Sequence, residues 1–111
     1  VWHTGSGSSV RRLEAFCGLA WQQGLPSVLV EGGRGLASTF LEAGLVNRFW
    51  GFYGPRLLGG GREGLRFRVP RRLADAVTLD AVTHVSLGDD WAVTGLVAAP
   101  RRNGAAARRR A

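Results

Sequence analysis

The sequence has one cysteine, no lysine and no long apolar segment, and two of these absences exclude whole classes of protein. Cys17 alone cannot form an intramolecular disulfide or supply a site that needs several thiolates. No stretch approaches the roughly 18 apolar residues of a membrane-spanning helix. The first residues also lack the basic-then-apolar order of a secretory signal. We therefore expect a soluble, cytoplasmic protein with no membrane partner.

The missing lysine changes how the positive charge is interpreted. All fifteen basic residues are arginine, which we attribute to a GC-rich coding sequence, and the net charge is +7. Five of these arginines lie in residues 101–111, so residues 1–100 carry ten arginines against eight acidic residues, a net charge of +2. The sequence thus predicts a nearly neutral body, large enough for one compact domain, and a disordered Arg-rich tail over residues 99–111.

Helical periodicity marks the beginning of the body. Residues 1–9 are small and polar and are expected to form a flexible N-terminal end. Apolar residues then recur at the i, i+3, i+4, i+7 spacing of one helix face. This spacing predicts a helix over residues 10–23, with Ser9 as a candidate N-cap and Gly24 as the stop.

A short apolar run and a second helix follow. Residues 27–30 contain the apolar run Val-Leu-Val, with two β-branched valines, after Pro26, and such a run is typical of a strand buried on both faces. Residues 35–43 have apolar side chains on one side and are followed by Gly44, so they predict a short helix that begins at a glycine-rich turn.

The rest of the body has the pattern of strands. Residues 48–53 are aromatic and predict a strand, and residues 77–87 alternate apolar and polar side chains at the period of a half-exposed strand. Gly88 begins a turn, after which residues 91–97 return as a second strand of an antiparallel hairpin. The expected fold class is α/β, with a mixed sheet that is flanked by helices and ends in this hairpin.

The turn between the buried strand and the second helix is the strongest candidate site. Glycines allow a ligand to approach the backbone, and the free N–H groups at a helix start attract phosphate. Arg34, Ser38 and Thr39 can add donors there. Glu31, at the carboxyl end of the expected strand, stands where α/β sheets place groups that contact ligands. The alternatives left open are a tight turn without a ligand and a solvated carboxylate.

Four short sequence motifs, in the order given below, indicate a resemblance to a known family. They are residues 28–33 (Val-Leu-Val-Glu-Gly-Gly), residues 36–46, residues 53–60 and residues 87–90 (Leu-Gly-Asp-Asp). Residues 10–98 resemble the C-terminal half of the reductase domain of the riboflavin-biosynthesis bifunctional deaminase-reductase family. The resemblance implies part of a dihydrofolate-reductase-like fold.

The resemblance also implies an activity and a set of site residues. The activity is reduction by NADPH of 5-amino-6-(5-phosphoribosylamino)uracil, a phosphorylated aminouracil whose ribosyl side chain becomes ribityl. Glu31 would contact this substrate. The NADPH phosphates would be held by the turn and the start of the helix, namely Gly32, Gly33, Arg34, Gly35, Leu36, Ala37, Ser38 and Thr39. The reaction requires no metal and no nucleophile from the protein, because the cofactor brings the hydride.

Departures from the family leave other functions open. Arg34-Gly35 stands where the family usually has Pro-Thr, and the first half of the family's domain has no counterpart in the chain. Two alternatives therefore remain: a nucleotide-binding remnant without catalysis, and a basic nucleic-acid-binding protein. The second is disfavoured because no stretch of the sequence matches a known DNA- or RNA-binding module. An incomplete sheet is also expected to pair with a second copy, as a homodimer or an aggregate.

Overall fold

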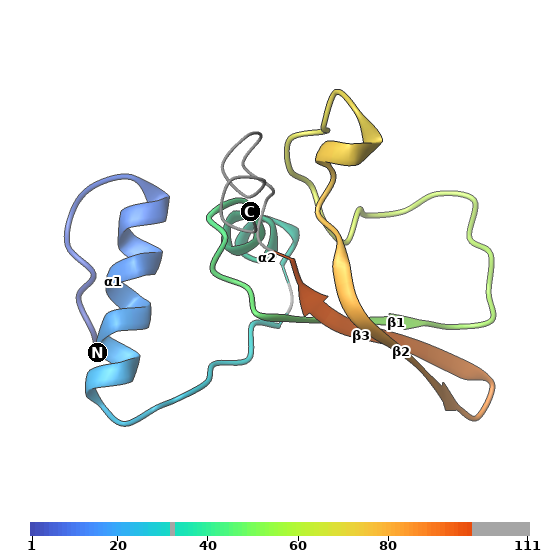
Figure 1. The fold of residues 1–111 in the computed structure, drawn as a ribbon, viewed down its shortest axis with the longest axis horizontal. Coiled ribbons are helices and arrows are strands. Elements are labelled where there is room, and N and C mark those ends of the chain that lie inside the picture. Colours follow the sequence, from blue (N-terminus) through green and yellow to red (C-terminus); the bar gives the residue numbers. More distant parts are fainter. Residues whose placement is uncertain (32, 99–111) are drawn as a thin grey trace, which may run out of the picture. The chain divides into compact units, whose positions relative to one another are not determined.

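The computed structural model describes residues 1–31 and 33–98 (Figure 1). Gly32 of the expected cofactor turn and the expected Arg-rich tail, residues 99–111, lie outside the described residues. The chain forms two compact units. Unit 1 contains Val1–Leu45 and Arg62–Arg68, and unit 2 contains Val46–Gly61 and, among the described residues, 69–98.

Unit 1 contains the two predicted helices, α1 (Ser9–Gln22) and α2 (Arg34–Glu42), which contact each other. The N-cap of α1 is Ser8 rather than Ser9, and its hydroxyl oxygen accepts a hydrogen bond from the Arg11 N–H at 3.3 Å. The shift by one residue is within the usual uncertainty of a helix end predicted from sequence.

Both helices end in the same way, at a glycine followed by a leucine. Gly24 and Gly44 have φ angles of +74° and +70°, a region that residues with a Cβ atom adopt at a cost. The next residue then folds back, so that Leu25 N–H donates to Ala20 O at 2.9 Å and Leu45 N–H donates to Phe40 O at 3.1 Å. This pattern satisfies the last carbonyl groups of each helix and explains why the two glycines were correct stop signals.

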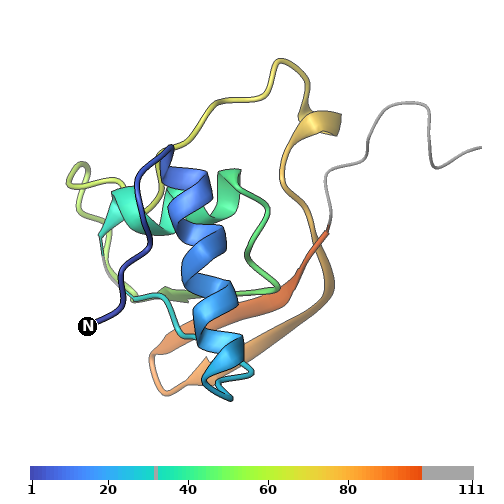
Figure 2. The ribbon, with the colours of Figure 1, turned by 90° about the vertical axis from the view of Figure 1, so that its left-hand side faces the viewer.

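The predicted strand over residues 27–30 is wrong. No strand is assigned to residues 25–31, which run as an irregular extended segment between the helices (Figure 2). Val28 and Leu29 are 47% and 78% exposed, although the apolar run predicted burial on both faces. A strand exists only where another strand accepts its N–H and C=O groups, and no other described segment pairs with this one.

Unit 2 contains a three-stranded antiparallel sheet in the order β1-β3-β2, formed by β1 (Arg48–Tyr53), β2 (Leu79–Leu87) and β3 (Asp90–Val97). The predicted strand over residues 48–53 and the predicted hairpin are confirmed. The predicted mixed sheet is wrong for the described residues, because every pairing between their strands is antiparallel. A single-turn 3₁₀ helix, η1 (Leu73–Asp75), precedes the hairpin.

The hairpin contains an irregularity that the period-2 pattern did not predict. The register of β2 against β3 shifts between Asp80 and Thr83, and Ala81 within this bulge has a φ of +49°. The extra residue interrupts the alternation of inward and outward side chains. Leu79 and Val85 are therefore the only residues of β2 that are partly buried, on either side of the bulge.

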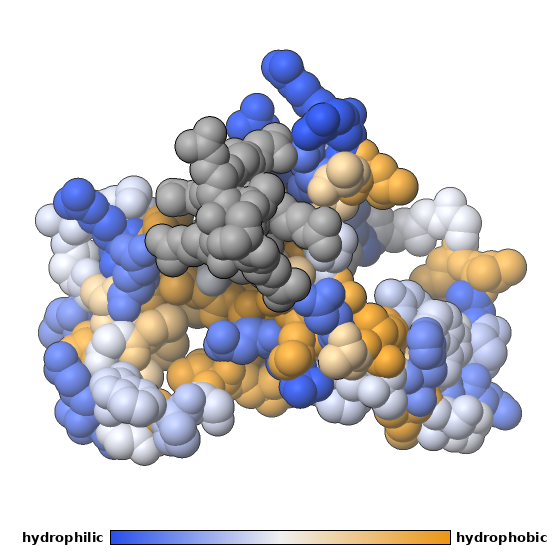
Figure 3. Space-filling model, viewed as in Figure 1, coloured by the Kyte–Doolittle hydropathy of each residue, from blue (hydrophilic) through white to orange (hydrophobic). Residues whose placement is uncertain are grey.

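Few apolar side chains are buried in either unit. The buried hydrophobic residues of the described chain are Ala20, Phe40 and Ala92, joined by the polar residues Ser38 and Thr94. Large apolar side chains are correspondingly exposed, and hydrophobic surface is visible among the hydrophilic side chains in Figure 3. None of the helices in the described residues is long and apolar enough to cross a membrane.

Candidate functional site

The start of α2 is an uncapped helix N-terminus. Gly33 occupies the N-cap position with φ +59° and ψ 103°, and its carbonyl accepts the N–H of Ala37 at 3.3 Å. Having no side chain, Gly33 cannot cap the first N–H groups of the helix, and the first turn contains no acidic residue. These N–H groups and the positive end of the helix dipole form an environment that favours an anion.

A strap, residues 62–68, runs along α2 and is bound to it through backbone N–H groups. The N–H of Arg66 donates to the Ser38 hydroxyl oxygen at 2.7 Å, and the N–H of Arg68 donates to Glu42 Oε1 at 2.8 Å. Ser38 and Glu42 are four residues apart and share one face of the helix, while Arg66 and Arg68 are two apart in extended chain. The two spacings match, so the strap is held at two successive points.

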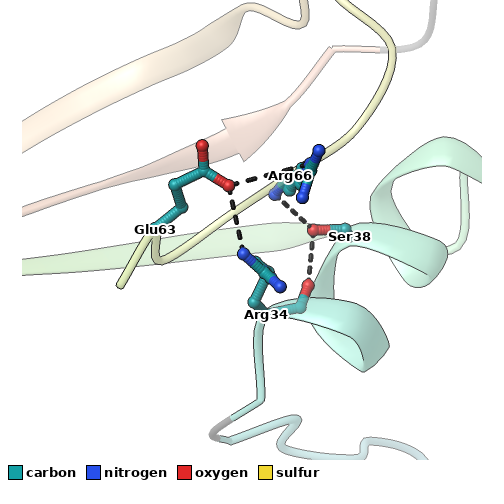
Figure 4. Close-up of polar contacts among 4 residues, drawn as sticks. All are labelled: Arg34, Ser38, Glu63 and Arg66. Carbon is teal, nitrogen blue, oxygen red and sulfur yellow. Dashed lines mark hydrogen bonds and ion pairs between the residues drawn. The ribbon is translucent and has the colours of Figure 1, made fainter. Parts of the chain in front are cut away.

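Ser38 is fully occupied in this arrangement. Its hydroxyl group donates to the carbonyl oxygen of Arg34, at 2.5 Å, and accepts from Arg66 (Figure 4). The residue is 3% exposed. A serine has a single O–H donor, so in this arrangement Ser38 has no hydrogen left to donate to a phosphate. Thr39 likewise donates its one O–H, to Gly35 O at 2.8 Å, but it does so at the exposed surface of the helix.

The strap also brings a carboxylate to the start of α2. Glu63 Oε2 lies 3.2 Å from Arg34 Nη1 and 3.8 Å from Arg66 Nε, so one oxygen faces two guanidinium groups (Figure 4). All three side chains are about half exposed or more. Arg34, the residue that replaces the family's usual proline, is therefore paired within the protein.

An open groove of about 460 Å³ lies beside the start of α2. Its lining is mainly apolar and consists of Phe16, Val28, Leu29, Val30, Glu31, Leu36 and Phe40. Glu31 is an exposed residue and the one ionisable group of this lining. Ligand sites commonly combine an apolar wall with a few polar groups, and the volume is in the usual range of such sites.

The structure brings some of the sequence-predicted residues together. Glu31 and Leu36 line the same groove, and Gly33, Arg34 and Gly35 form the start of α2 next to it. Ala37, Ser38 and Thr39 follow within the helix, where Ser38 is turned to the strap. The strap itself, with Glu63 and Arg66, was missed, because a glycine-rich loop without periodicity gives no local signal of where it docks.

Titration is perturbed elsewhere, in unit 2. The hydrogen bonds from Arg72 lower the pKa of the Asp75 carboxyl below its ordinary value, and the pKa of Arg72 is raised by the same pairing. The two residues form a two-point pair at 3.0 Å around η1. Residues 1–31 and 33–98 contain no group of three His, Cys, Asp or Glu side chains placed to hold a metal ion.

Comparison with known proteins relates the chain to one solved structure and to one protein family. A solved structure of Acinetobacter baumannii RibD, form 2, is similar to the chain with a TM-score of 0.68 and 22% sequence identity. The similarity covers 85% of this chain and 26% of that one, so the chain spans about a quarter of that protein's length. At this level of identity the likeness concerns the fold, which is a partial RibD-like fold. No curated protein matches the sequence significantly.

The family model of the RibD C-terminal domain matches residues 10–93. The chain therefore belongs to the RibD C-terminal domain family, the reductase domain of riboflavin biosynthesis, and the resemblance noted in the sequence is confirmed. Members of this family are typically NADPH-dependent reductases that bind a pyrimidine substrate.

Proposed function

We propose that this chain binds NADPH as part of a reductase that acts on 5-amino-6-(5-phosphoribosylamino)uracil. The observation that carries the proposal is the family match over residues 10–93, which includes the whole of the candidate site. When bound, NADPH supplies the hydride that reduces the ribosyl side chain. The family's biosynthetic role supports a cytoplasmic location for this activity.

The start of α2 fits a cofactor phosphate. Gly33 leaves the first N–H groups uncapped, and a Cβ atom built at Gly33 or Gly35 would meet nothing within 4 Å, so the backbone is open to a ligand. Arg34, at the first position of the helix, adds a guanidinium group that can bind phosphate. In this proposal Gly33, Arg34 and Gly35 hold the phosphates, while Ser38 holds the strap and the Thr39 O–H stays bonded to Gly35 O.

The groove fits the uracil side of the reaction. Its apolar residues suit a flat ring, and Glu31 can accept hydrogen bonds from ring N–H or amino groups. Because Leu36 belongs both to this wall and to the first turn of α2, a substrate in the groove would lie close to a cofactor at the helix start. We assign Glu31 to substrate binding on this basis.

Catalysis by the isolated chain should be weak. The chain spans 26% of the RibD structure that it resembles, so most of that enzyme lies outside the similarity. The edges of β1 and β2 have no partner strand among the described residues, which favours association with a second copy. A nucleotide-binding protein without turnover is therefore the second candidate function.

One pair of assays tests these alternatives. NADPH binding is measured by fluorescence titration, and turnover is measured as the loss of NADPH absorbance with the aminouracil phosphate present. Binding with slow turnover supports the reductase site, and binding with no turnover supports the second candidate. Failure to bind NADPH at low salt would contradict both. Association with DNA or RNA that weakens steeply with added salt would favour the nucleic-acid alternative.

A further inference from the structure

Glu63 lies where an anion would be expected to bind. Its carboxylate oxygen is within 4 Å of the guanidinium groups of both Arg34 and Arg66. Arg34 begins a helix whose first N–H groups have no side-chain cap, so the same region already favours negative charge. A carboxylate between two guanidinium groups is the kind of partner that a phosphate can replace, because both groups have two oxygens that can accept a pair of N–H bonds from one arginine.

The strap allows the Glu63 side chain to leave without moving the backbone. Arg66 and Arg68 hold the strap to α2 through backbone N–H bonds to Ser38 and Glu42, and neither bond involves Glu63. A rotation of the Glu63 side chain would therefore free Arg34 and Arg66 while the strap stays docked. The competing carboxylate is tethered at a fixed place beside the helix start.

The pairing is weak enough to be exchanged. The side chains of Arg34, Glu63 and Arg66 are 48%, 58% and 69% exposed. Ion pairs at this exposure contribute little to stability, because water screens the charges and long side chains lose freedom. A phosphate dianion carries more charge and more acceptor oxygens than a carboxylate, and it can also accept from the backbone N–H groups at the helix start.

We propose that Glu63 is a built-in competitor for the phosphate site, which a phosphate group of the dinucleotide displaces from Arg34 and Arg66 on binding. The proposal rests on the proposed function for the identity of the ligand. Glu63 then sets the affinity of the site: it keeps the two arginines paired when no cofactor is bound and makes binding weaker than the arginines alone would allow.

The test compares Glu63→Gln with a matched control. Asp75→Asn removes the same charge from another exposed arginine–carboxylate pair, at Arg72, in unit 2. Glu63→Gln should tighten the binding of NADPH and of inorganic pyrophosphate by about two- to fivefold, the upper part of the range that an exposed ion pair contributes. Asp75→Asn should change both dissociation constants by less than about twofold. Circular dichroism checks that the variants remain folded.

A second variant separates a specific competitor from a general effect of charge. In an Arg34→Ala background, Glu63→Gln should lose most of its effect, because the guanidinium group that it frees is gone. NADH serves as a further ligand: equal tightening of NADPH and NADH assigns the pyrophosphate to the site, and tightening of NADPH alone assigns the 2′-phosphate.

The outcomes distinguish this inference from the proposed function. Unchanged affinity in Glu63→Gln for both NADPH and pyrophosphate would overturn the competitor role and leave NADPH binding by the wild type intact. Tighter pyrophosphate binding in a protein that does not bind NADPH would support the competitor and contradict the proposed cofactor. Equal tightening by Asp75→Asn would also overturn it.

Discussion

Replacing Ser38 with alanine tests whether this residue holds the strap. Its hydroxyl group makes two hydrogen bonds, to Arg34 O and from Arg66 N, and the residue is buried. Ser38→Ala removes both bonds and leaves the Arg66 N–H without its acceptor. A lost hydrogen bond that leaves a partly buried group unpaired costs about 1–3 kcal/mol, so we expect the free energy of unfolding to fall by about 2 kcal/mol.

Thr39→Val is the matched control for this change. It also removes a hydroxyl group that donates to a carbonyl four residues earlier, but the Thr39 bond is exposed and touches no part of the strap. Its expected effect is below about 0.5 kcal/mol, as for most surface substitutions. Urea unfolding followed by circular dichroism measures both values under the same conditions.

Hydrogen exchange at the Arg66 amide provides a local measurement. If Ser38 is the acceptor, Ser38→Ala should speed exchange there about 30-fold, the factor that corresponds to about 2 kcal/mol, and Thr39→Val should leave it unchanged. Unchanged exchange and stability in Ser38→Ala would refute this reasoning. If the same variant then bound NADPH more weakly, Ser38 would be a phosphate ligand instead.

Three further predictions follow from burial, backbone conformation and titration. Phe40→Ala should lower the free energy of unfolding by about 3 kcal/mol in urea unfolding, and Leu36→Ala, half exposed on the same groove, by about 1 kcal/mol or less; equal losses would contradict the assigned core. Ala81→Gly should raise the melting temperature, by the equivalent of about 1 kcal/mol, because glycine adopts the positive φ without strain; a lower value would mean that the bulge is absent. The pKa of the Asp75 carboxyl, measured by NMR, should lie below its ordinary value. The pairing with Arg72 therefore stabilises η1 at pH values above the ordinary pKa, and this stabilisation is lost as the pH falls through the lowered pKa. Arg72→Gln should return the pKa of Asp75 to its ordinary range.

The elements with a local signal were predicted well from the sequence. Both helices carry apolar residues at helical spacing and end at glycines that adopt positive φ angles, so their limits are encoded within a few residues of each end. β1 and the hairpin were also predictable, because aromatic and alternating residues favour strands and Gly88 allows the turn. Membership of the family was correctly predicted from four short sequence motifs.

The features that depend on distant partners were not predictable. Residues 27–30 have the composition of a buried strand, but pairing decides whether a strand forms, and composition contains no information about the partner. The bulge at Ala81 leaves no mark in the alternating sequence pattern, because it changes only how β2 is paired with β3. Glu63 comes from a loop without periodicity, and its position beside Arg34 depends on the docking of the strap, which joins residues 28 apart in the chain.

The order of synthesis determines when the strap can bind to α2. A ribosome completes α2 and then β1 before residue 66 is added, so Ser38 and Arg34 are made well before the residues that pair with them. The entropy lost on closing a loop grows only slowly with loop length, so the loop between α2 and the strap costs little more free energy to close than a shorter loop would. A nascent chain stopped after residue 45 would contain both helices of unit 1 without Glu63 or Arg66. In such a shortened chain the guanidinium group of Arg34 would have no Glu63 carboxylate facing it.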